Sequence, residues 1–430
     1  MDATPDASSS AESQYRVRAH VAQAVSSEHV LKHGDTFAVL DPYGDITADN
    51  GERGVYHMGT RHLSHLTIQL DLPNAGTQRP VLLDAAVREE NGLFVSDFTN
   101  PDFTDEAGHD LSQGTLHFFR SKLLWEGALY EHLRIRNYGL DPAQISFALT
   151  YAADYVDLFE VRGFRRKRRG ELLPAEAGAD YADLAYRGLD EQVRKTRLTF
   201  TPEPEACTAS HARYHLRLDP GEEADFYWTI ACFQETTVAR TRSYEEAKAE
   251  RRRVMRARRG AACTLVTSNE QFNAWIGRSL DDLNLLLTDV PYGHYPYAGI
   301  PWYSTVFGRD GLLTALMTLW INPNIARGVL AYLAATQAER VDARSEAEPG
   351  KILHETRDGE VPALGEVPFK RYYGTVDATP LFVMLAGAYY QHTGERAFLE
   401  KLWPHVERAL EWMREYGDVD GDGFIGYRTE

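Results

Sequence analysis

Hydrophobic and polar residues alternate in short segments over the first half of the chain. From about Tyr15 to Cys232, apolar side chains recur at every second position, as in Ile145–Thr150 and Tyr214–Leu218. Turn-forming sequences such as Asp41–Asp45 separate these segments at intervals of about 8 to 12 residues. This pattern predicts antiparallel sheets packed as a β-sandwich, which we place at residues 15–240.

The periodicity changes after Ser268, where apolar residues recur with the helical repeat of about 3.6 residues. Long loops rich in proline, glycine and aromatic residues separate the first helix from the second and the third from the fourth. Alternating short and long connections favour helical hairpins arranged as a toroid, with the long loops gathered at one end. The predicted helices are Asn269–Thr288, Arg309–Trp320, Asn324–Glu339, Thr379–His392 and Glu395–Tyr416.

The segment between these two regions is charged on nearly every face. Ser243–Gly260 has acidic residues early, basic residues late and glycine at its end, which predicts a solvated linker helix with a C-cap glycine, placed at 241–262. The first 14 residues are polar and lack an apolar stretch, so we expect a disordered tail and not a signal peptide or membrane anchor.

Composition narrows the classes of ligand. Forty-six Lys and Arg against 63 Asp and Glu give a net charge of −17, which opposes binding of nucleic acid and anionic lipid. No stretch approaches the roughly 18 apolar residues that span a membrane. The 3 cysteines are too few and too widely spaced for a disulfide framework or a cysteine metal site. We therefore expect a cytoplasmic protein with a neutral or cationic ligand and no cofactor.

The first long loop combines aromatic side chains with an Arg-Asp pair. Residues 290–311 contain four Tyr, one Trp and one Phe, and they end at Arg309 and Asp310. Aromatic rings stack on sugar rings, a carboxylate accepts hydrogen bonds from vicinal hydroxyls, and a guanidinium donates to ring oxygens. The loop therefore suits a terminal sugar. The alternative is that Asp310 caps the following helix and Arg309 pairs with an acid.

The second long loop, residues 350–382, also carries polar candidates. Asp377 lies just before the predicted start of a helix, so it could equally well cap that helix or bind a ligand. Glu355 and Glu360 are either an acid and base pair or solvated carboxylates. His354 beside Glu355 lacks the HExxH pattern, so we expect no metal there.

Two further charged motifs have alternative interpretations. Asp418, Asp420 and Asp422 match the first half of a calcium loop, but they also suit an acidic turn between helices. The basic run 165–169 is interpreted as a solvated β-hairpin turn in preference to a nucleic-acid site.

Several longer motifs together resemble bacterial amylo-α-1,6-glucosidases and glycogen-debranching-like proteins, relatives of the six-hairpin glycoside hydrolases. The resemblance extends over roughly residues 28–430. Its motifs are DPYGDI, GVYHMGTRHLS, DYVDLFEVRG, PWYSTVFGRDG, HETRDGE, YYGTVDATPLF and DVDGDGFIGYRTE.

This resemblance implies a role for each candidate side chain. Arg309 and Asp310 would hold hydroxyls of the non-reducing terminal glucose. The pocket wall would consist of Trp302, Tyr303 and Phe307, with Glu355, Tyr373 and Asp377 lining it from the second loop. The implied fold is an N-terminal β-sandwich, a linker helix and, at 263–430, the first part of an (α/α)₆ toroid. In that family the general acid and base lie beyond the last motif, so this chain would carry the sugar-binding part alone.

The implied reaction is release of glucose from α-glucans by inversion, with α-1,6 branch stubs as the expected target. The alternative is a non-catalytic glycan-binding or scaffold fragment that needs a partner chain. A second alternative is a related hydrolase with another bond preference, such as a trehalose hydrolase. An incomplete toroid exposes an apolar seam, so we expect self-association or a further C-terminal portion.

Overall fold

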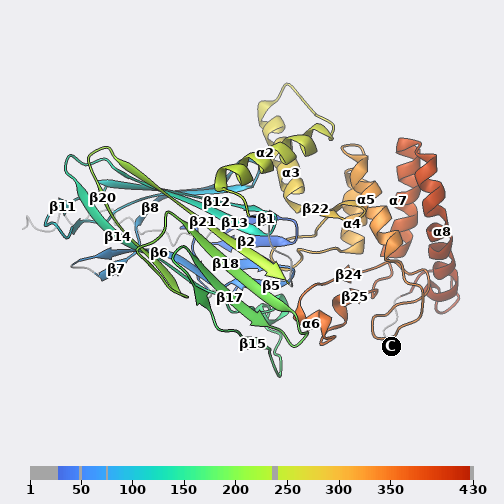
Figure 1. Ribbon diagram of the computed structural model, residues 1–430. Coiled ribbons are helices and arrows are strands. Elements are labelled where there is room, and N and C mark those ends of the chain that lie inside the picture. The colour runs from blue at the N-terminus through green and yellow to red at the C-terminus, as the bar shows by residue number, and fades with distance from the viewer. Residues whose placement is uncertain (1–27, 48–50, 74–75, 235–240, 427–430) are drawn as a thin grey trace, which may run out of the picture.

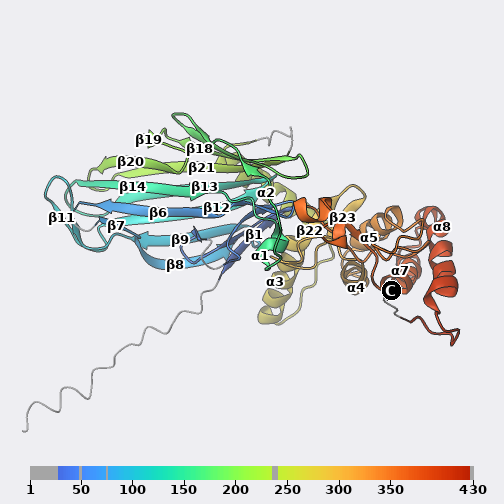
Figure 2. The same cartoon turned by 90° about the horizontal axis from the view of Figure 1, so that it is seen from below.

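The computed structural model describes residues 28–47, 51–73, 76–234 and 241–426. The tail predicted at residues 1–14 lies outside the described residues. Strands gather at one end of the molecule and helices α4, α5, α7 and α8 at the other (Figures 1 and 2). We call residues 28–234 the β-domain and residues 263–426 the helical domain.

The larger sheet of the β-domain has nine strands, and every pair in it is antiparallel. Its order is β15-β17-β18-β21-β13-β12-β9-β8, with β16 paired to β17. The strands are β8 (Val81–Arg88), β9 (Leu93–Thr99), β12 (Leu116–Trp125), β13 (Ala128–Asn137), β15 (Glu171–Leu172), β16 (Glu176–Ala177), β17 (Tyr181–Arg187), β18 (Val193–Thr201) and β21 (Glu223–Gln234).

The second sheet has six strands in the order β19-β20-β14-β6-β3, with β7 paired to β6. Its strands are β3 (Ile46–Thr47), β6 (His65–Leu72), β7 (Gly76–Gln78), β14 (Ala143–Ala152), β19 (Ala206–Cys207) and β20 (His211–Leu218). A four-stranded sheet consists of β1 (His29–His33), β2 (Thr36–Leu40), β4 (Gly54–His57) and β5 (Thr60–Leu63). The hairpins are β10 (Phe103–Thr104) with β11 (Asp110–Leu111), β22 (Leu287–Val290) with β23 (Gly293–Pro296), and β24 (Glu355–Thr356) with β25 (Arg371–Tyr372).

The alternating pattern buries one face of each sheet in a shared core. Phe147 of β14 stacks on Tyr214 of β20 and meets Phe226 of β21 edge to face, so the two large sheets contact each other through aromatic rings. Trp228 is also buried in this cluster. The sequence prediction of an antiparallel β-sandwich followed by helices is therefore confirmed.

The connecting helix α2 (Tyr244–Gly260) begins with the capping box of Ser243 and Glu246. The prediction of a solvated linker was wrong in one respect. Tyr244 and Ala247 are buried against Leu123, Trp125 and Tyr130 of the large sheet. Their spacing, continued by Arg251 and Met255, places one stripe of the helix on the sheet. Gly260 belongs to the last turn, and the C-cap is Ala261 in a right-handed conformation, so the predicted C-cap glycine is also wrong.

The helical domain contains the five predicted helices with boundaries moved by a few residues. Its long helices are α3 (Glu270–Leu286), α4 (Gly308–Met317), α5 (Pro323–Ala335), α7 (Ala378–Thr393) and α8 (Arg396–Trp412). Short helical turns are α1 (Leu158–Val161) in the β-domain, α6 (Glu360–Ala363), η2 (Pro368–Lys370) and the π-turn η3 (Met413–Gly417). Helices α4, α5, α7 and α8 share one apolar core, which includes Leu312, Leu330, Phe382 and Leu402.

Helix α3 differs from these four because none of its residues is buried. It presents Trp275 at 63% exposure, while Met317 at the end of α4 is 73% exposed and Trp320 is 54% exposed. An apolar surface therefore lies open on this part of the chain. Among the described residues, no helix is both long and apolar enough to cross a membrane.

Candidate functional site

The first turn of α4 holds Arg309 and Asp310 against the second loop. The amide of Gly308 donates a hydrogen bond to the carbonyl of His354 at 2.8 Å. A Cβ at position 308 would lie 1.9 Å from the carbonyl oxygen of Leu353, so this approach requires glycine. Phe307 is the N-cap residue and makes no side-chain cap bond. The hypothesis that Asp310 caps this helix is therefore wrong.

Arg357 connects the two long loops. Its Nε donates to Glu355 Oε2 at 2.7 Å, and its Nη1 donates to the carbonyl of Trp302, also at 2.7 Å. Glu355 in turn forms a β-bridge with Phe307. Both Glu355 and Arg357 are 7% exposed, so this ion pair is shielded from water and fixes the positions of both loops.

A cleft of about 600 Å³ lies where these loops meet the β-domain. One group of its lining residues is apolar or aromatic, namely Phe159, Ala298, Tyr303, Phe307 and Phe369. The other group is polar, namely Arg162, Arg309, Asp310, His354, Glu355 and Arg357. Aromatic walls with converging charged and hydrogen-bonding groups are the lining expected of a site for a polar, ring-shaped ligand.

The β-domain contributes two of these residues, which the sequence reasoning did not place in the site. Phe159 lies on α1, and Arg162 directly follows that helix. The Arg162 guanidinium lies 5.6 Å from the ring of Trp302 and 5.7 Å from that of Tyr303. Both residues lie within the motif DYVDLFEVRG, and this motif was the sequence signal that could have placed them in the site.

Ion pairs and burial set the protonation of two groups in or beside the cleft. Burial would raise the pKa of Asp377, but a hydrogen bond from Thr375 and the neighbouring Arg309 guanidinium hold that pKa below its ordinary value. Burial lowers the pKa of His354, which keeps the imidazole neutral near pH 7. The buried Nδ1 of His354 has no hydrogen-bond partner among the described residues.

The structure thus brings together five of the eight candidate residues in the cleft, namely Tyr303, Phe307, Arg309, Asp310 and Glu355. Asp377 stands at the N-cap position of α7, makes no cap bond there, and instead holds Arg309. Trp302 instead packs against the cluster that contains Phe37 and Tyr56. Tyr373 is buried, donates its hydroxyl to the carbonyl of Thr336, and lines a neighbouring cleft.

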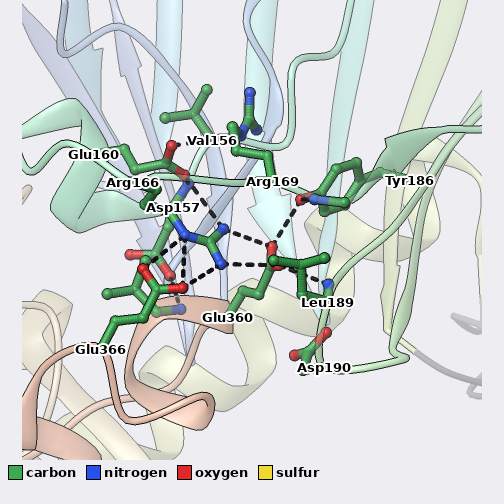
Figure 3. A network of polar contacts seen from close by, with 12 residues as sticks. Val156, Asp157, Glu160, Arg166, Arg169, Tyr186, Leu189, Asp190, Glu360 and Glu366 are labelled. Carbon is green, nitrogen blue, oxygen red and sulfur yellow. Dashed lines mark hydrogen bonds and ion pairs between the residues drawn. The ribbon is translucent and has the colours of Figure 1, made fainter.

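Glu360 does not join Glu355 as an acid and base pair, because it lies in the junction between the domains. Its Oε1 accepts from the amide of Leu189 at 2.7 Å, and its Oε2 accepts from the hydroxyl of Tyr186 at 2.8 Å. Figure 3 shows Glu360 between Tyr186 and Arg166, with Glu366 on the other side of that guanidinium. These contacts account for a 2% exposed carboxylate.

The same contacts correct the interpretation of the basic run. Residues 165–169 are not a hairpin turn but an irregular segment that follows α1. Arg166 pairs with both Glu360 and Glu366 of the helical domain, so it is an interdomain ion-pair residue.

The acidic motif near the last helix forms a compact group. Ligand oxygens of Asp418, Asp420 and Asp422 all lie within 4.8 Å of one another. Asp418 Oδ2 also accepts from the amide of Gly423, and Asp422 Oδ1 from that of Phe424. The calcium loop and the acidic turn both remain hypotheses.

Residues 31–229 match the family model of the N-terminal domain of (some) glycogen debranching enzymes. The β-domain is therefore similar to the N-terminal domain of these enzymes. It is the part of the chain that supplies Phe159 and Arg162 to the cleft.

The whole chain is similar in fold to a solved structure described as a kojibiose phosphorylase from the human microbiome. The two share 12% identity with a TM-score of 0.57, over 84% of this chain and 50% of that one. This likeness shows the fold alone, and the chain spans about half the length of that relative. A structure described as an aldose 1-epimerase from Escherichia coli K12 shows 9% identity and a TM-score of 0.29, over 48% of this chain and 99% of the other. A comparison with curated protein sequences gave no match.

Proposed function

We propose that the cleft binds the non-reducing terminal glucose of an α-glucan. The observation that carries this proposal is that Arg309 and Asp310 line the same cleft as the aromatic side chains of Tyr303 and Phe307. A glucosyl ring seated there stacks its apolar face on an aromatic ring, while Asp310 accepts from two hydroxyls and Arg309 donates to ring or hydroxyl oxygens. The similarity of the β-domain to that of glycogen debranching enzymes supports this class of ligand.

We further propose that the chain is part of an inverting glucosidase whose target is the α-1,6 branch stub, acting in the cytoplasm without a cofactor. Inversion requires a general acid and a general base about 6.5 to 9.5 Å apart. Asp310 and Glu355 are the carboxylates among the described residues that line the cleft. Arg357 donates to Glu355, and Arg309 lies 4.0 Å from Asp310. A carboxylate beside a guanidinium stays ionised and is suited to accept hydrogen bonds from sugar hydroxyls. We therefore propose that this chain supplies the sugar-binding part of the site.

The alternative is a non-catalytic glycan-binding or scaffold role. Calorimetric titration of the chain with maltotriose tests binding. An assay of glucose release from maltooligosaccharides and limit dextrin tests catalysis. We expect binding, a loss of at least tenfold in affinity for Asp310→Asn, and no steady glucose release. Unchanged affinity in that variant would refute the sugar site. Steady glucose release would refute the assignment of a binding role alone.

Asp84→Asn is a suitable control for the binding assay. Asp84 lies on β8 of the β-domain, and its side chain is 64% exposed. The substitution removes one carboxylate charge as Asp310→Asn does, but at a position outside the cleft lining. We expect its affinity for maltotriose to match that of the original chain.

A further inference from the structure

A second, larger cleft lies beside the sugar cleft and has the opposite charge balance to the chain as a whole. Its volume is about 940 Å³, and Arg357 lines both clefts. We call it the charged cleft. Its cations are Arg340, Arg344, Arg357, Lys370 and Arg371, and its carboxylates are Glu339, Asp342 and Asp358. Five cations against three carboxylates make it locally positive in a chain of net charge −17.

Backbone contacts hold one wall of the charged cleft in place. Arg371 belongs to β25 and is paired in register with Thr356 of β24. The hydroxyl of Thr356 donates to the carbonyl of Lys370 at 2.8 Å. The positions of Lys370 and Arg371 are therefore set by a hairpin and not by a free loop.

The other wall is a folded loop after α5. Asp342 and Ala347 form an isolated β-bridge, and Asp342 accepts from the amide of Arg344 at 3.1 Å. The Arg344 guanidinium donates a hydrogen bond to the carbonyl of Gly365, which also lines the cleft. Both walls thus have a fixed backbone, which reduces the entropy that a bound ligand would cost.

Most of the cationic groups in this cleft have no acidic partner. Among the described residues, Arg340, Lys370 and Arg371 make no ion pair, whereas Arg357 is paired with Glu355. Cations without an ion pair thus line one hollow in a strongly acidic protein, and this local positive charge favours an anionic ligand.

We infer that the charged cleft binds a phosphate dianion, either as free inorganic phosphate or as the monoester of a sugar. Guanidinium groups bind phosphoryl oxygens in a bidentate manner, so Arg340 and Arg371 are the expected phosphate contacts. The carboxylates of Glu339 and Asp358 then accept hydrogen bonds from hydroxyls when the phosphoryl group is attached to a sugar. This inference concerns a site separate from the terminal-glucose site and stands without it.

Calorimetric titration of the full chain in phosphate-free, low-salt buffer tests this inference with three probes: inorganic phosphate, glucose 1-phosphate and glucose. We expect one or both phosphates to bind and glucose to bind far more weakly at this cleft. Tighter binding of glucose 1-phosphate identifies a sugar-borne phosphoryl group, and equal binding of both identifies the free anion. Either result supports the site, and added sodium chloride should weaken it because screening reduces the attraction of exposed charges.

The double variant Arg340→Gln with Arg371→Gln should lower phosphate affinity by at least tenfold, because it removes two charge-assisted hydrogen-bond donors. Lys370→Gln is a second, milder variant at the same wall. Arg217→Gln, on the exposed face of β20, removes a charge elsewhere and is the matched control. Absence of phosphate binding, or equal affinity in the double variant and the control, would overturn the inference.

Asp310→Asn separates this site from the proposed sugar site. We expect that variant to lose maltotriose binding while phosphate affinity stays unchanged. Loss of phosphate binding in Asp310→Asn would show that the phosphate occupies the sugar cleft, which would also overturn the inference.

Discussion

Arg309 Nη1 lies 3.2 Å from Asp377 Oδ2, so the first turn of α4 and the start of α7 are joined by an ion pair beside the cleft. The pair orients the guanidinium that we assign to the terminal sugar. Thr375 donates its hydroxyl to the other oxygen of Asp377 and fixes that carboxylate in turn. Asp377 is therefore a positioning residue, which acts through Arg309.

Replacing Asp377 with Asn should weaken maltotriose binding about threefold to tenfold, because the Arg309 guanidinium loses the charge that orients it. The two side chains are 48% and 38% exposed, so the free energy of unfolding should fall by less than about 1 kcal/mol. Calorimetry and urea melts measure both quantities. Asp84→Asn is again the control, and full affinity in Asp377→Asn would contradict the positioning role.

Arg162→Ala tests the contribution of the β-domain to the cleft. Its guanidinium lies over the rings of Trp302 and Tyr303, and an exposed cation–π contact contributes about 0.5 to 1 kcal/mol. We expect a twofold to fivefold loss of maltotriose affinity with little change in thermal stability. Arg213→Ala, on β20, is the matched control. Identical maltotriose affinities for Arg162→Ala and Arg213→Ala would show that Arg162 does not contribute to the site.

Glu360→Gln should weaken the junction between the domains. The carboxylate is 2% exposed and pairs with Arg166, and loss of one partner from a buried pair costs about 3 to 5 kcal/mol. We expect the helical domain to unfold at a lower denaturant concentration than the β-domain, seen as a second transition. Glu366→Gln changes the more exposed partner of the same guanidinium and should have a smaller effect. A single, unshifted transition in Glu360→Gln would contradict the interdomain role.

Asp157 should make stability depend on pH. It is 2% exposed, and burial raises the pKa of its carboxyl from 3.8 to about 6, although the amides of Phe159 and Val361 donate to it. Because the folded pKa is raised, the protonated form stabilises the fold below about pH 4, and this contribution is lost as the pH rises to about 6. The change amounts to about 3 kcal/mol.

Urea melts between pH 4 and pH 7 measure this effect. We expect Asp157→Asn to be less stable than the original chain, because the Asn side chain cannot accept hydrogen bonds from both backbone amides. Its stability should not decrease between pH 4 and pH 6, because Asn does not titrate. Asp84→Asn should still show that decrease. A pH profile of Asp157→Asn parallel to that of the original chain would show that another group titrates.

The exposed apolar surface of Trp275, Met317 and Trp320 should cause the chain to associate with itself as its concentration rises. Sedimentation velocity over a range of concentrations measures this association. The triple substitution of these residues with serine should shift the chain towards the monomer and raise its solubility. A monomer at every concentration would contradict the prediction.

Local sequence pattern was sufficient for the alternating strands of the β-domain and the long helices, but not for β23, β24, β25 and the short turns within the two long loops. The alternation in β14 and β20 and the helical repeat of α7 and α8 follow from which side chains each face must bury, and this is a property of neighbouring positions. The capping box of Ser243 and Glu246 is likewise local. What such patterns could not show is that the stripe of Tyr244 and Ala247 has a sheet beneath it.

For the site, the sequence determined the residue types, and only the tertiary structure decided their partners. Arg309 and Asp310 could be named from their loop, and the resemblance gave them a role. Contacts between distant segments bring Arg162 into the cleft and place Glu360 at the domain junction. Such contacts also hold Tyr373 outside the cleft. Net charge is a property of composition, but the unpaired cations of the charged cleft arise from how two walls fold together. Ion pairing and burial are set by distance in space, which sequence spacing does not encode.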